Sequence, residues 1–200
     1  TMATGTTTTT DPSDWHAQLR AAIRTHTDLE RALRLTDDER RGVQWAERAG
    51  MPLLIPPYYL SLVDPTDPSC PIRRQCVPQA AESRRVRGEL RDPLGEGAHE
   101  VAPRLVRRYP DRALLLVTST CAVHCRFCTR GRMVGTEEGY VPIAALEPAF
   151  RWLEGHPEVR EVLVSGGDPL VASTARLDGL LGRIRRITSI EVLRIGTRVP

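Results

Sequence analysis

The sequence contains no lysine, so all 28 of its basic residues are arginine. No side-chain amine in these 200 residues is therefore available to form a Schiff base with a carbonyl compound. Long apolar runs are absent as well: none approaches the roughly 18 residues that a membrane-spanning helix needs. No signal peptide is visible either. The sequence thus predicts a protein without a membrane partner.

Charge of a single sign is also missing. The 28 basic and 25 acidic residues alternate along the chain and leave a formal net charge of +3. Such alternation is typical of a solvated surface, and no basic block predicts a nucleic-acid partner. Apolar residues make up 40% of the chain, which is enough to form a core and excludes wholesale disorder.

Cysteine is too unevenly placed for a disulfide framework. There are five cysteines, an odd number, and three of them are crowded together after residue 120. A small secreted protein would instead use paired cysteines to replace part of its core. The distribution favours a reducing compartment, so we expect a cytoplasmic protein.

The pattern along the chain predicts three regions. Residues 1–12 are rich in threonine and predict a disordered tail. Residues 13–105 predict a small helical region followed by an extended connector. Residues 106–200 predict an α/β domain.

The helical region, residues 13–50, is expected to contain two or three short helices. In its first segment, one helix face would carry Trp15, Leu19, Ala22 and Ile23, which recur at helical spacing. We expect Trp15 to be a core residue on that face.

Helix boundaries are indicated by threonines followed three residues later by glutamate. Thr27 with Glu30, and Thr36 with Glu39, both predict capping boxes at helix starts. The helix that starts near the second box is expected to end at Gly50, because glycine favours helix C-termini.

Proline recurs every few residues between Met51 and Pro78. Proline excludes a long helix or a central strand, so we predict an extended, loop-rich connector that continues as a charged stretch to about residue 100. Two cysteines of this connector, Cys70 and Cys76, are expected to be ordinary packed thiols.

A different pattern follows the connector. The apolar run at 113–120 predicts a strand buried on both faces. Further strands are expected at 159–169 and 189–200, with helices at 143–156 and 173–187. This order predicts parallel βαβ units with right-handed crossovers. Three parallel strands do not close a barrel, so we expect an incomplete one.

Cys121, Cys125 and Cys128 follow directly after the first of these strands, with the spacing C-x3-C-x2-C. In parallel α/β folds the chemistry collects at the C-terminal ends of the strands. A structural zinc site would need a fourth ligand, and His124 would have to bend back sharply to supply it. A [4Fe–4S] cluster held by three thiolates instead leaves one iron open to a small molecule, which is the interpretation we favour.

The sequence VSGGDP, residues 164–169, ends the second expected strand. Most Gly-Gly turns only reverse the chain direction. Together with the cysteine motif, however, this turn resembles the radical S-adenosylmethionine (SAM) superfamily. The resemblance implies that the open iron chelates SAM and that one electron from the cluster releases a 5′-deoxyadenosyl radical. It also implies that the turn meets the methionyl amino group, with Asp168 where Glu is usual.

Longer segments resemble the lysine 2,3-aminomutase family in order and spacing, over about residues 13–200. They are DWHAQL, PYYLSLVDPTDPSCPIRRQ, RYPDRALLLVTSTC, CRFCTR, VSGGDPL and RIGTRVP. The resemblance implies a partial TIM-like (β/α) radical SAM barrel with about three βα units. It also implies a pyridoxal 5′-phosphate (PLP) enzyme that moves an amino group between adjacent carbons, most often converting L-lysine to β-lysine.

The same resemblance assigns roles to individual residues. The expected cluster ligands are Cys121, Cys125 and Cys128. The expected SAM-binding residues are Phe127, near the adenine, and Ser165, Gly166, Gly167 and Asp168 in the turn. The expected PLP-site residues are Arg108, Tyr109 and Arg112, since arginines suit a dianionic phosphate. Arg130 is expected near the substrate carboxylate, where it would be the catalytic-site arginine.

Two departures from the family pattern matter. Gly131 stands where the family usually has arginine, and the lysine that would hold PLP is missing. We expect that lysine beyond residue 200, in a longer protein. These residues alone would then be poorly stable, because their strands would expose buried faces and an open edge.

Other functions remain open. The substrate is expected to be an amino acid, either lysine, glutamate or a protein-bound lysine. A related radical SAM enzyme without PLP, and a non-catalytic iron–sulfur or zinc module, are the alternatives. The family resemblance implies a flavodoxin- or ferredoxin-type reductant as a partner, and a tendency to form homo-oligomers.

Overall fold

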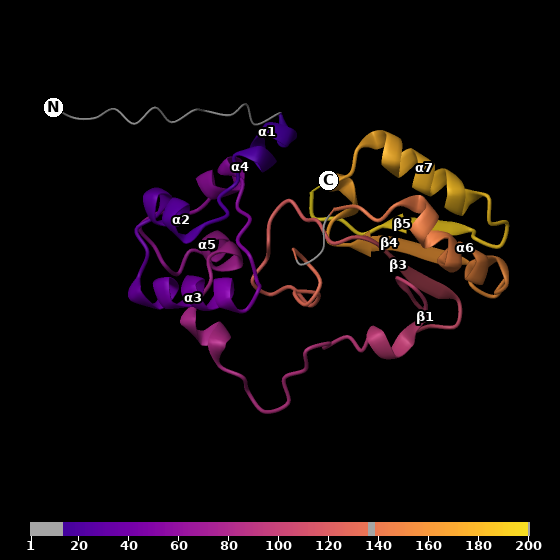
Figure 1. Cartoon of the computed structure of the whole chain (residues 1–200), viewed down its shortest axis with the longest axis horizontal. Helices are drawn as coiled ribbons and strands as arrows, with labels where there is room; N and C mark the ends of the chain where they lie inside the picture. The colour runs from indigo at the N-terminus through magenta and orange to yellow at the C-terminus, as the bar shows by residue number, and fades with distance from the viewer. Residues whose placement is uncertain (1–13, 136–138, 200) are drawn as a thin grey trace. The chain divides into compact units, whose positions relative to one another are not determined.

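Figure 1 shows a computed structural model of the protein, which describes residues 14–135 and 139–199. The predicted disordered tail, residues 1–12, lies outside the described residues. Within the described part of the chain, no helix combines the length and apolar character needed to cross a membrane.

The described chain divides into two compact units. The first runs as far as Arg84 and also includes Val123–Arg126. The second consists of Arg85–Ala122 and the chain from Phe127 onward. The predicted boundary between residues 105 and 106 stays a prediction.

Three short helices begin the first unit, as predicted: α1 (Trp15–Arg20), α2 (His26–Ala32) and α3 (Asp37–Arg48). The capping box at the start of α3 is confirmed. The Thr36 side chain accepts from the Glu39 N–H, and the Glu39 carboxylate accepts from the Thr36 N–H at 2.8 Å. These bonds satisfy two amides that the helix itself leaves unpaired.

The capping box predicted at Thr27 and Glu30 is wrong. The cap of α2 is Thr25, whose side chain accepts from the Asp28 N–H at 3.1 Å. Its hydroxyl in turn donates to the Asp28 carboxylate at 2.6 Å. Thr25 has the extended backbone that a cap requires, whereas Thr27 already lies inside the helix.

The helix face predicted for the first segment is also wrong. Helix α1 ends at Arg20, so Ala22 and Ile23 do not extend its face. Ile23 instead forms an antiparallel bridge with Ile55. Trp15 is 40% exposed rather than a core residue. Tertiary pairing with the proline-rich segment ends the helix before its pattern does.

The proline-rich segment has no long helix, as predicted, but it is less extended than expected. It contains α4 (Pro57–Ser61) and α5 (Pro71–Cys76), followed by the 3₁₀ helix η1 (Ala80–Ser83). Both α-helices begin with proline, which is tolerated there because the first amide of a helix has no intrahelical partner. Proline therefore starts these helices rather than preventing them.

A buried ion pair lies in the core of the first unit. The Arg73 guanidinium binds the Glu39 carboxylate at 2.7 and 2.8 Å, and it also donates to the carbonyl oxygens of Arg34 and Pro65 at 2.9 Å. The two side chains are 1% and 3% exposed. A charged pair is tolerated at this depth only because its hydrogen-bonding groups are so fully used.

Cys70 and Cys76 are both buried in the first unit, which confirms that they are packed thiols. Cys76 belongs to an apolar cluster built from α2, α3 and the proline-rich segment. All five cysteines are free thiols in the structure.

The second unit contains a five-stranded sheet in the order β1-β2-β3-β4-β5 (Figure 1). Its strands are β1 (Glu100–Ala102), β2 (Leu105–Val106), β3 (Arg112–Thr118), β4 (Glu161–Gly166) and β5 (Val192–Ile195). Strands β3, β4 and β5 are parallel, as predicted. The antiparallel β1 and β2 were not predicted, because such short strands carry no alternating pattern of their own.

Helices connect the parallel strands. After β3 come η3 (Ile143–Leu146) and α6 (Glu147–Glu154), and after β4 come η4 (Pro169–Val171) and α7 (Thr174–Arg185). A further 3₁₀ turn, η2 (Gly97–His99), precedes β1. The two α-helices match the predicted positions, and apolar residues of both belong to one core cluster with the strands.

Alternate residues of the strands face this core. Ala113 and Leu115 of β3 lie opposite Val162 and Val164 of β4, and all four are buried. Leu114 on the other face of β3 is only half-buried, so burial on both faces is incomplete. The described part of the second unit is thus a mixed α/β structure, and its five-stranded sheet does not close into a barrel.

Candidate functional site

The chain after β3 and the chain after β4 meet at the C-terminal end of these parallel strands. The Gly167 N–H donates to the Thr118 carbonyl oxygen, and the Asp168 N–H donates to the Thr120 carbonyl oxygen, both at 2.7 Å. A Cβ on Gly167 would lie 2.2 Å from the Thr120 oxygen, and a Cβ on Gly166 would lie 2.2 Å from the Thr118 oxygen. Gly166 also has φ 131°, which other residues rarely adopt. Glycine at both positions is therefore what permits this close approach.

The Asp168 carboxylate ties the end of β4 to the chain after β5. One oxygen accepts from the Leu170 N–H at 3.0 Å and from the Thr197 hydroxyl at 2.7 Å. The other accepts from the Arg198 N–H at 2.7 Å. The residue is only 5% exposed. Since an ionised carboxylate offers about four acceptor positions, roughly one remains for another donor.

Arg130 and Ser165, both predicted from the sequence, are brought together in the second unit. The Arg130 Nη1 lies 3.4 Å from the Ser165 Oγ. Its Nε and Nη2 both lie 2.8 Å from one Glu96 oxygen. The Arg130 and Glu96 side chains are 18% and 6% exposed. Glu96 thus holds the guanidinium through Nε and Nη2. The outer edge of the guanidinium, which carries Nη1, is directed towards Ser165 of β4.

A second arginine shares the same carboxylate. The Arg132 Nη2 lies 2.8 Å from the other Glu96 oxygen and 3.2 Å from the Asp92 Oδ1. The Gly97 N–H, 2.8 Å from the Asp92 Oδ2, holds the pKa of Asp92 below its usual value. Two arginines and two carboxylates therefore form a charge-balanced network with Arg130 at one end.

The three predicted cluster ligands lie in one loop but not in one unit. Cys125 belongs to the first unit, and Cys121 and Cys128 belong to the second. All three are half-buried. Within residues 14–135 and 139–199, no three Cys, His, Asp or Glu side chains are grouped as metal ligands. The ligand set stays a prediction.

His124 is held within the first unit. Its Nδ1 lies 2.9 Å from the Pro52 carbonyl oxygen, and because that oxygen can only accept, the proton is on Nδ1. Burial lowers the pKa of His124 below its usual value. The Nδ1 atom is thus already committed to the backbone of the first unit.

Phe127 is 60% exposed, and the Arg198 guanidinium lies over its ring, 5.1 Å from the centroid. Arg198 is also the residue whose backbone N–H donates to Asp168. Two residues predicted to contact SAM are thus linked through a third that the sequence did not single out. The exposed aromatic face is the kind of surface on which a nucleobase stacks.

Arg108, Tyr109 and Arg112 lie at the other end of β3. Arg112 is the first residue of that seven-residue strand, whereas the cysteine loop follows the last. At about 3.3 Å per residue, the strand separates these ends by roughly 20 Å. The Arg112 guanidinium binds the Asp111 carboxylate at 3.0 Å. These residues are exposed and are not brought together with Ser165, so their PLP role stays a prediction.

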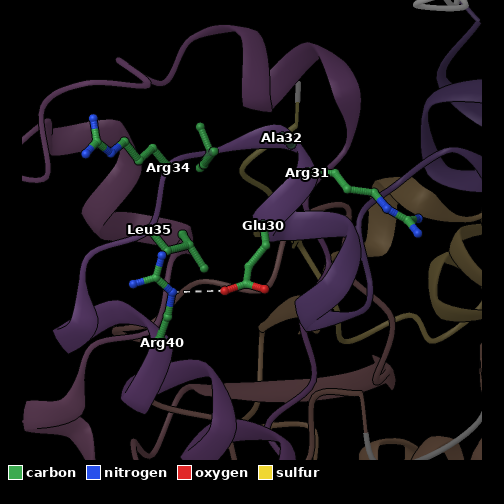
Figure 2. A pocket seen from close by; sticks show the side chains of 7 residues that line it. Glu30, Arg31, Ala32, Arg34, Leu35 and Arg40 are labelled. Carbon is green, nitrogen blue, oxygen red and sulfur yellow. Dashed lines mark hydrogen bonds and ion pairs between the residues drawn. The ribbon is translucent and has the colours of Figure 1, made fainter. Parts of the chain in front are cut away.

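Figure 2 shows a separate hollow in the first unit, with a volume of about 450 Å³. In it the Arg40 Nε donates to the Glu30 carboxylate at 3.0 Å, and Arg31 points away from that pair (Figure 2). None of the predicted site residues lines it. The lining residues are Glu30, Arg31, Ala32, Leu33, Arg34, Leu35 and Arg40.

Sequence reasoning missed Glu96, Thr118, Thr120 and Arg198. Glu96 is one acid in a strongly charged stretch, where nothing local distinguishes it from its neighbours. Thr118 and Thr120 act through their carbonyl oxygens, which any residue type supplies. Only Arg198 left a signal, because it lies in the RIGTRVP segment that carried part of the resemblance.

Comparison with known proteins identifies aminomutases among the relatives of this chain. No protein-family model matches the chain. It is 43% identical over 188 residues to an L-lysine 2,3-aminomutase of Bacillus subtilis (strain 168), which covers 94% of this chain and 40% of that relative. It is 40% identical over 190 residues to the L-lysine 2,3-aminomutase of Clostridium subterminale, covering 95% of this chain and 45% of the relative.

A relative with another substrate is also similar. The chain is 37% identical over 144 residues to a glutamate 2,3-aminomutase of Clostridioides difficile (strain 630), covering 72% of this chain and 34% of the relative. The chain thus spans less than half the length of these three relatives.

Proposed function

The chain belongs to the lysine 2,3-aminomutase family, and on this premise we propose that it is part of a radical SAM, PLP-dependent amino-acid 2,3-aminomutase. The proposed reaction is the exchange of an amino group and a hydrogen between adjacent carbons, most often of L-lysine to give β-lysine. Glutamate is the first alternative substrate, because one relative is named for it. A protein-bound lysine is the second.

One observation carries the proposal: the C-x3-C-x2-C motif follows β3 at the end where the Gly166–Gly167 turn of β4 packs. A purely structural metal site would not need a second strand to end in a Gly-Gly turn. Glycine at this turn lets the chain after β4 pack directly against the chain that leads into the cysteine motif, because no Cβ separates the two backbones. The pairing of thiols with this turn therefore supports a ligand-binding metal centre.

The donor set fits an iron–sulfur cluster. Thiolates are soft ligands that favour iron–sulfur clusters, and three of them leave one iron without a protein ligand. Cys121, Cys125 and Cys128 are half-buried rather than packed into a core, and none of them is in a disulfide. When bound, the cluster with SAM and PLP would supply the radical and electron-sink chemistry that protein side chains lack.

The residues of the chain would then bind and orient. Ser165, Gly166 and Gly167 would offer their backbone to the methionyl group of SAM, and the remaining acceptor position of Asp168 would receive its ammonium. The exposed ring of Phe127 would stack on the adenine. Arg130 would direct its outer edge to the substrate carboxylate, a planar pairing that guanidinium makes well.

A second candidate is a radical SAM enzyme of the same family that does not use PLP. The specific observation in its favour is that Arg108, Tyr109 and Arg112 lie at the opposite end of β3 from the cysteine loop. The sequence also contains no lysine. In the PLP-dependent proposal, the lysine that binds PLP would come from a part of the protein outside these 200 residues.

The finer fold and the partners are parts of the same proposal. The βαβαβ arrangement of β3, β4 and β5 would form part of a TIM-like radical SAM barrel, with further strands extending the sheet beyond β5. We propose a cytoplasmic enzyme that takes electrons from a flavodoxin- or ferredoxin-type reductant. It would work as a homo-oligomer, as the family tends to.

The test uses the full-length protein that contains this chain, reconstituted anaerobically with iron, sulfide and PLP. With SAM, a reductant and L-lysine, we expect 5′-deoxyadenosine formation and β-lysine, detected by chromatography and mass spectrometry. Parallel reactions with L-glutamate and with a lysine-containing peptide identify the substrate. SAM cleavage without a PLP absorbance band would support the second candidate, and a protein that binds no cluster would overturn both.

A further inference from the structure

The middle of the cysteine loop, Val123–Arg126, is built into the first unit although the residues on either side belong to the second. Val123 packs against the apolar cluster of the first unit. The His124 N–H donates to the Leu54 carbonyl oxygen at 3.1 Å. The Arg126 N–H donates to the Gln75 carbonyl oxygen at 2.8 Å. The backbone is therefore held on both sides of Cys125.

The Arg126 side chain makes the shortest of these contacts. Its Nη2 lies 2.6 Å from the Glu82 Oε2, and its Nε lies 3.1 and 3.3 Å from the two carboxylate oxygens. The two side chains are only 6% and 21% exposed. The Glu82 carboxylate is itself held by the Gln79 N–H at 2.9 Å. A charge-assisted, forked pair in this position fixes direction as well as distance.

Even partial burial of such a pair is unfavourable, so its presence beside Cys125 requires a reason. Removing a guanidinium and a carboxylate from water is unfavourable, and apolar residues of similar size are often as stabilising. Exposed arginines elsewhere in the chain would give the same solubility without that cost. The pair instead holds the backbone that carries Cys125 in one defined position.

We propose that Arg126 and Glu82 are positioning residues for the iron–sulfur cluster, which hold Cys125 in place before any metal binds. The inference rests on the proposed function, because it needs a cluster at these cysteines. It assigns a role to the proline-rich segment and to η1, because Leu54 and Gln75 of the segment and Glu82 of η1 supply the acceptors for the loop. Neither Arg126 nor Glu82 would itself be a ligand.

The test measures cluster stability in the full-length protein. Wild type, Arg126→Met, Glu82→Gln and Arg126→Lys are reconstituted anaerobically, and iron content, absorbance and the rate of cluster loss to a chelator are recorded. Removing residues that support a metal ligand typically costs 10- to 100-fold in metal affinity, so we expect chelator-driven loss to be about tenfold faster in Arg126→Met and Glu82→Gln. Arg126→Lys keeps the charge but not the fork, so its rate should lie between.

Arg183→Met is the matched control. Arg183 also makes a short ion pair, 2.7 Å from Glu147, with a side chain 15% exposed, but it lies on α7 in the second unit. Its loss should leave the rate of cluster loss unchanged. Far-UV circular dichroism of each variant checks that the protein is folded.

A second measurement needs no cluster. In metal-free protein, the backbone amides of His124 and Arg126 should be protected from hydrogen exchange, and this protection should fall in Arg126→Met but not in Arg183→Met. Unchanged protection and unchanged cluster loss in the Arg126 and Glu82 variants would overturn the positioning role alone. A wild-type protein that takes up no cluster would overturn the proposed function, and this inference with it.

Discussion

Gly167 lies so close to Thr120 that a Cβ on the glycine would come within 2.2 Å of the Thr120 carbonyl oxygen. This contact joins the end of β4 to the chain that leads from β3 into the cysteine loop. In the proposed function, this turn also binds SAM. The same glycine thus serves packing and the proposed binding of SAM.

Gly167→Ala should therefore damage both. The added methyl group meets backbone that has no room to move, so we expect a loss of roughly 1–3 kcal/mol in the free energy of unfolding. Thermal unfolding measures this loss, and SAM binding to the reconstituted protein should weaken as well. Gly182→Ala is the control, because a Cβ there meets nothing within 4 Å and alanine favours a helix. Equal stability of the two variants would contradict the prediction.

Replacing any one of Cys121, Cys125 and Cys128 with alanine should abolish the cluster. With only two thiolates the iron–sulfur centre loses the ligand set on which the proposal depends. Iron content and reductive SAM cleavage are the measurements. Cys70→Ala is the control, since Cys70 is buried among other residues of the first unit. Retained cleavage in a variant of the triplet would refute the ligand assignment.

Glu96→Gln should loosen Arg130. The amide keeps the shape but loses the charge that pairs with Arg130 and Arg132. Because the arginines keep about a fifth of their surface in water, we expect a loss of about 2 kcal/mol in stability, below the range for fully buried pairs. The Michaelis constant for the amino acid should rise more than the turnover number falls. An unchanged Michaelis constant would show that Arg130 does not depend on Glu96.

The buried pair of Arg73 and Glu39 should make the free energy of unfolding depend on pH in the acid range. Burial by itself would raise the pKa of Glu39, but hydrogen bonds from Arg73 and Thr36 hold it below its ordinary value of 4.5. A carboxyl whose pKa is lower when folded stabilises the protein above its unfolded pKa, and that stability is lost as the pH falls through the folded value. We therefore expect unfolding free energy to decline below about pH 4.5.

The matching variant is Glu39→Gln, in which the acid-dependent decline should be smaller. Its stability at neutral pH should fall by roughly 3–5 kcal/mol, because Arg73 is left buried without its partner. Chemical denaturation across the acid range measures both effects. A variant with the same acid dependence as wild type would place the titrating group elsewhere.

Cys76 should resist alkylation in the folded protein. Burial raises the pKa of its thiol to about 12, so the reactive thiolate is scarce near neutral pH. Iodoacetamide at about pH 8, followed by mass spectrometry, should label Cys121 and Cys128 before Cys76. Labelling of Cys76 at the same rate would show that it is not the packed thiol that the structure describes.

Local patterns predicted much of the second unit. The continuous apolar runs identified β3 and β4, and the helical spacing between them identified α6 and α7. These predictions succeeded because the burial of a strand or helix follows a regular pattern of apolar residues close together in the sequence. The short β1 and β2 were missed, since they exist as strands only through pairing with β3.

The first unit shows where local patterns mislead. The face predicted around Trp15 and Ile23 follows helical spacing, yet Ile23 pairs with Ile55, 32 positions along the chain. The predicted cap at Thr27 lost to Thr25, two residues earlier, because only Thr25 has the extended backbone of a cap. The first helix ends early because Ile23 pairs with a distant residue, which the local pattern does not contain. Thr25 and Asp28 have the same spacing as Thr27 and Glu30, so only the backbone conformation distinguishes the two caps.

The sequence by itself determined the residue types at the candidate site: three thiols at one spacing, two glycines after a buried strand, and no lysine. Tertiary structure alone decided the partners. Glu96 meets Arg130 across 34 residues, and Glu82 meets Arg126 across 44. An ion pair of this kind depends on which surfaces meet in the folded chain, whereas a spacing motif reports only the chain's local geometry.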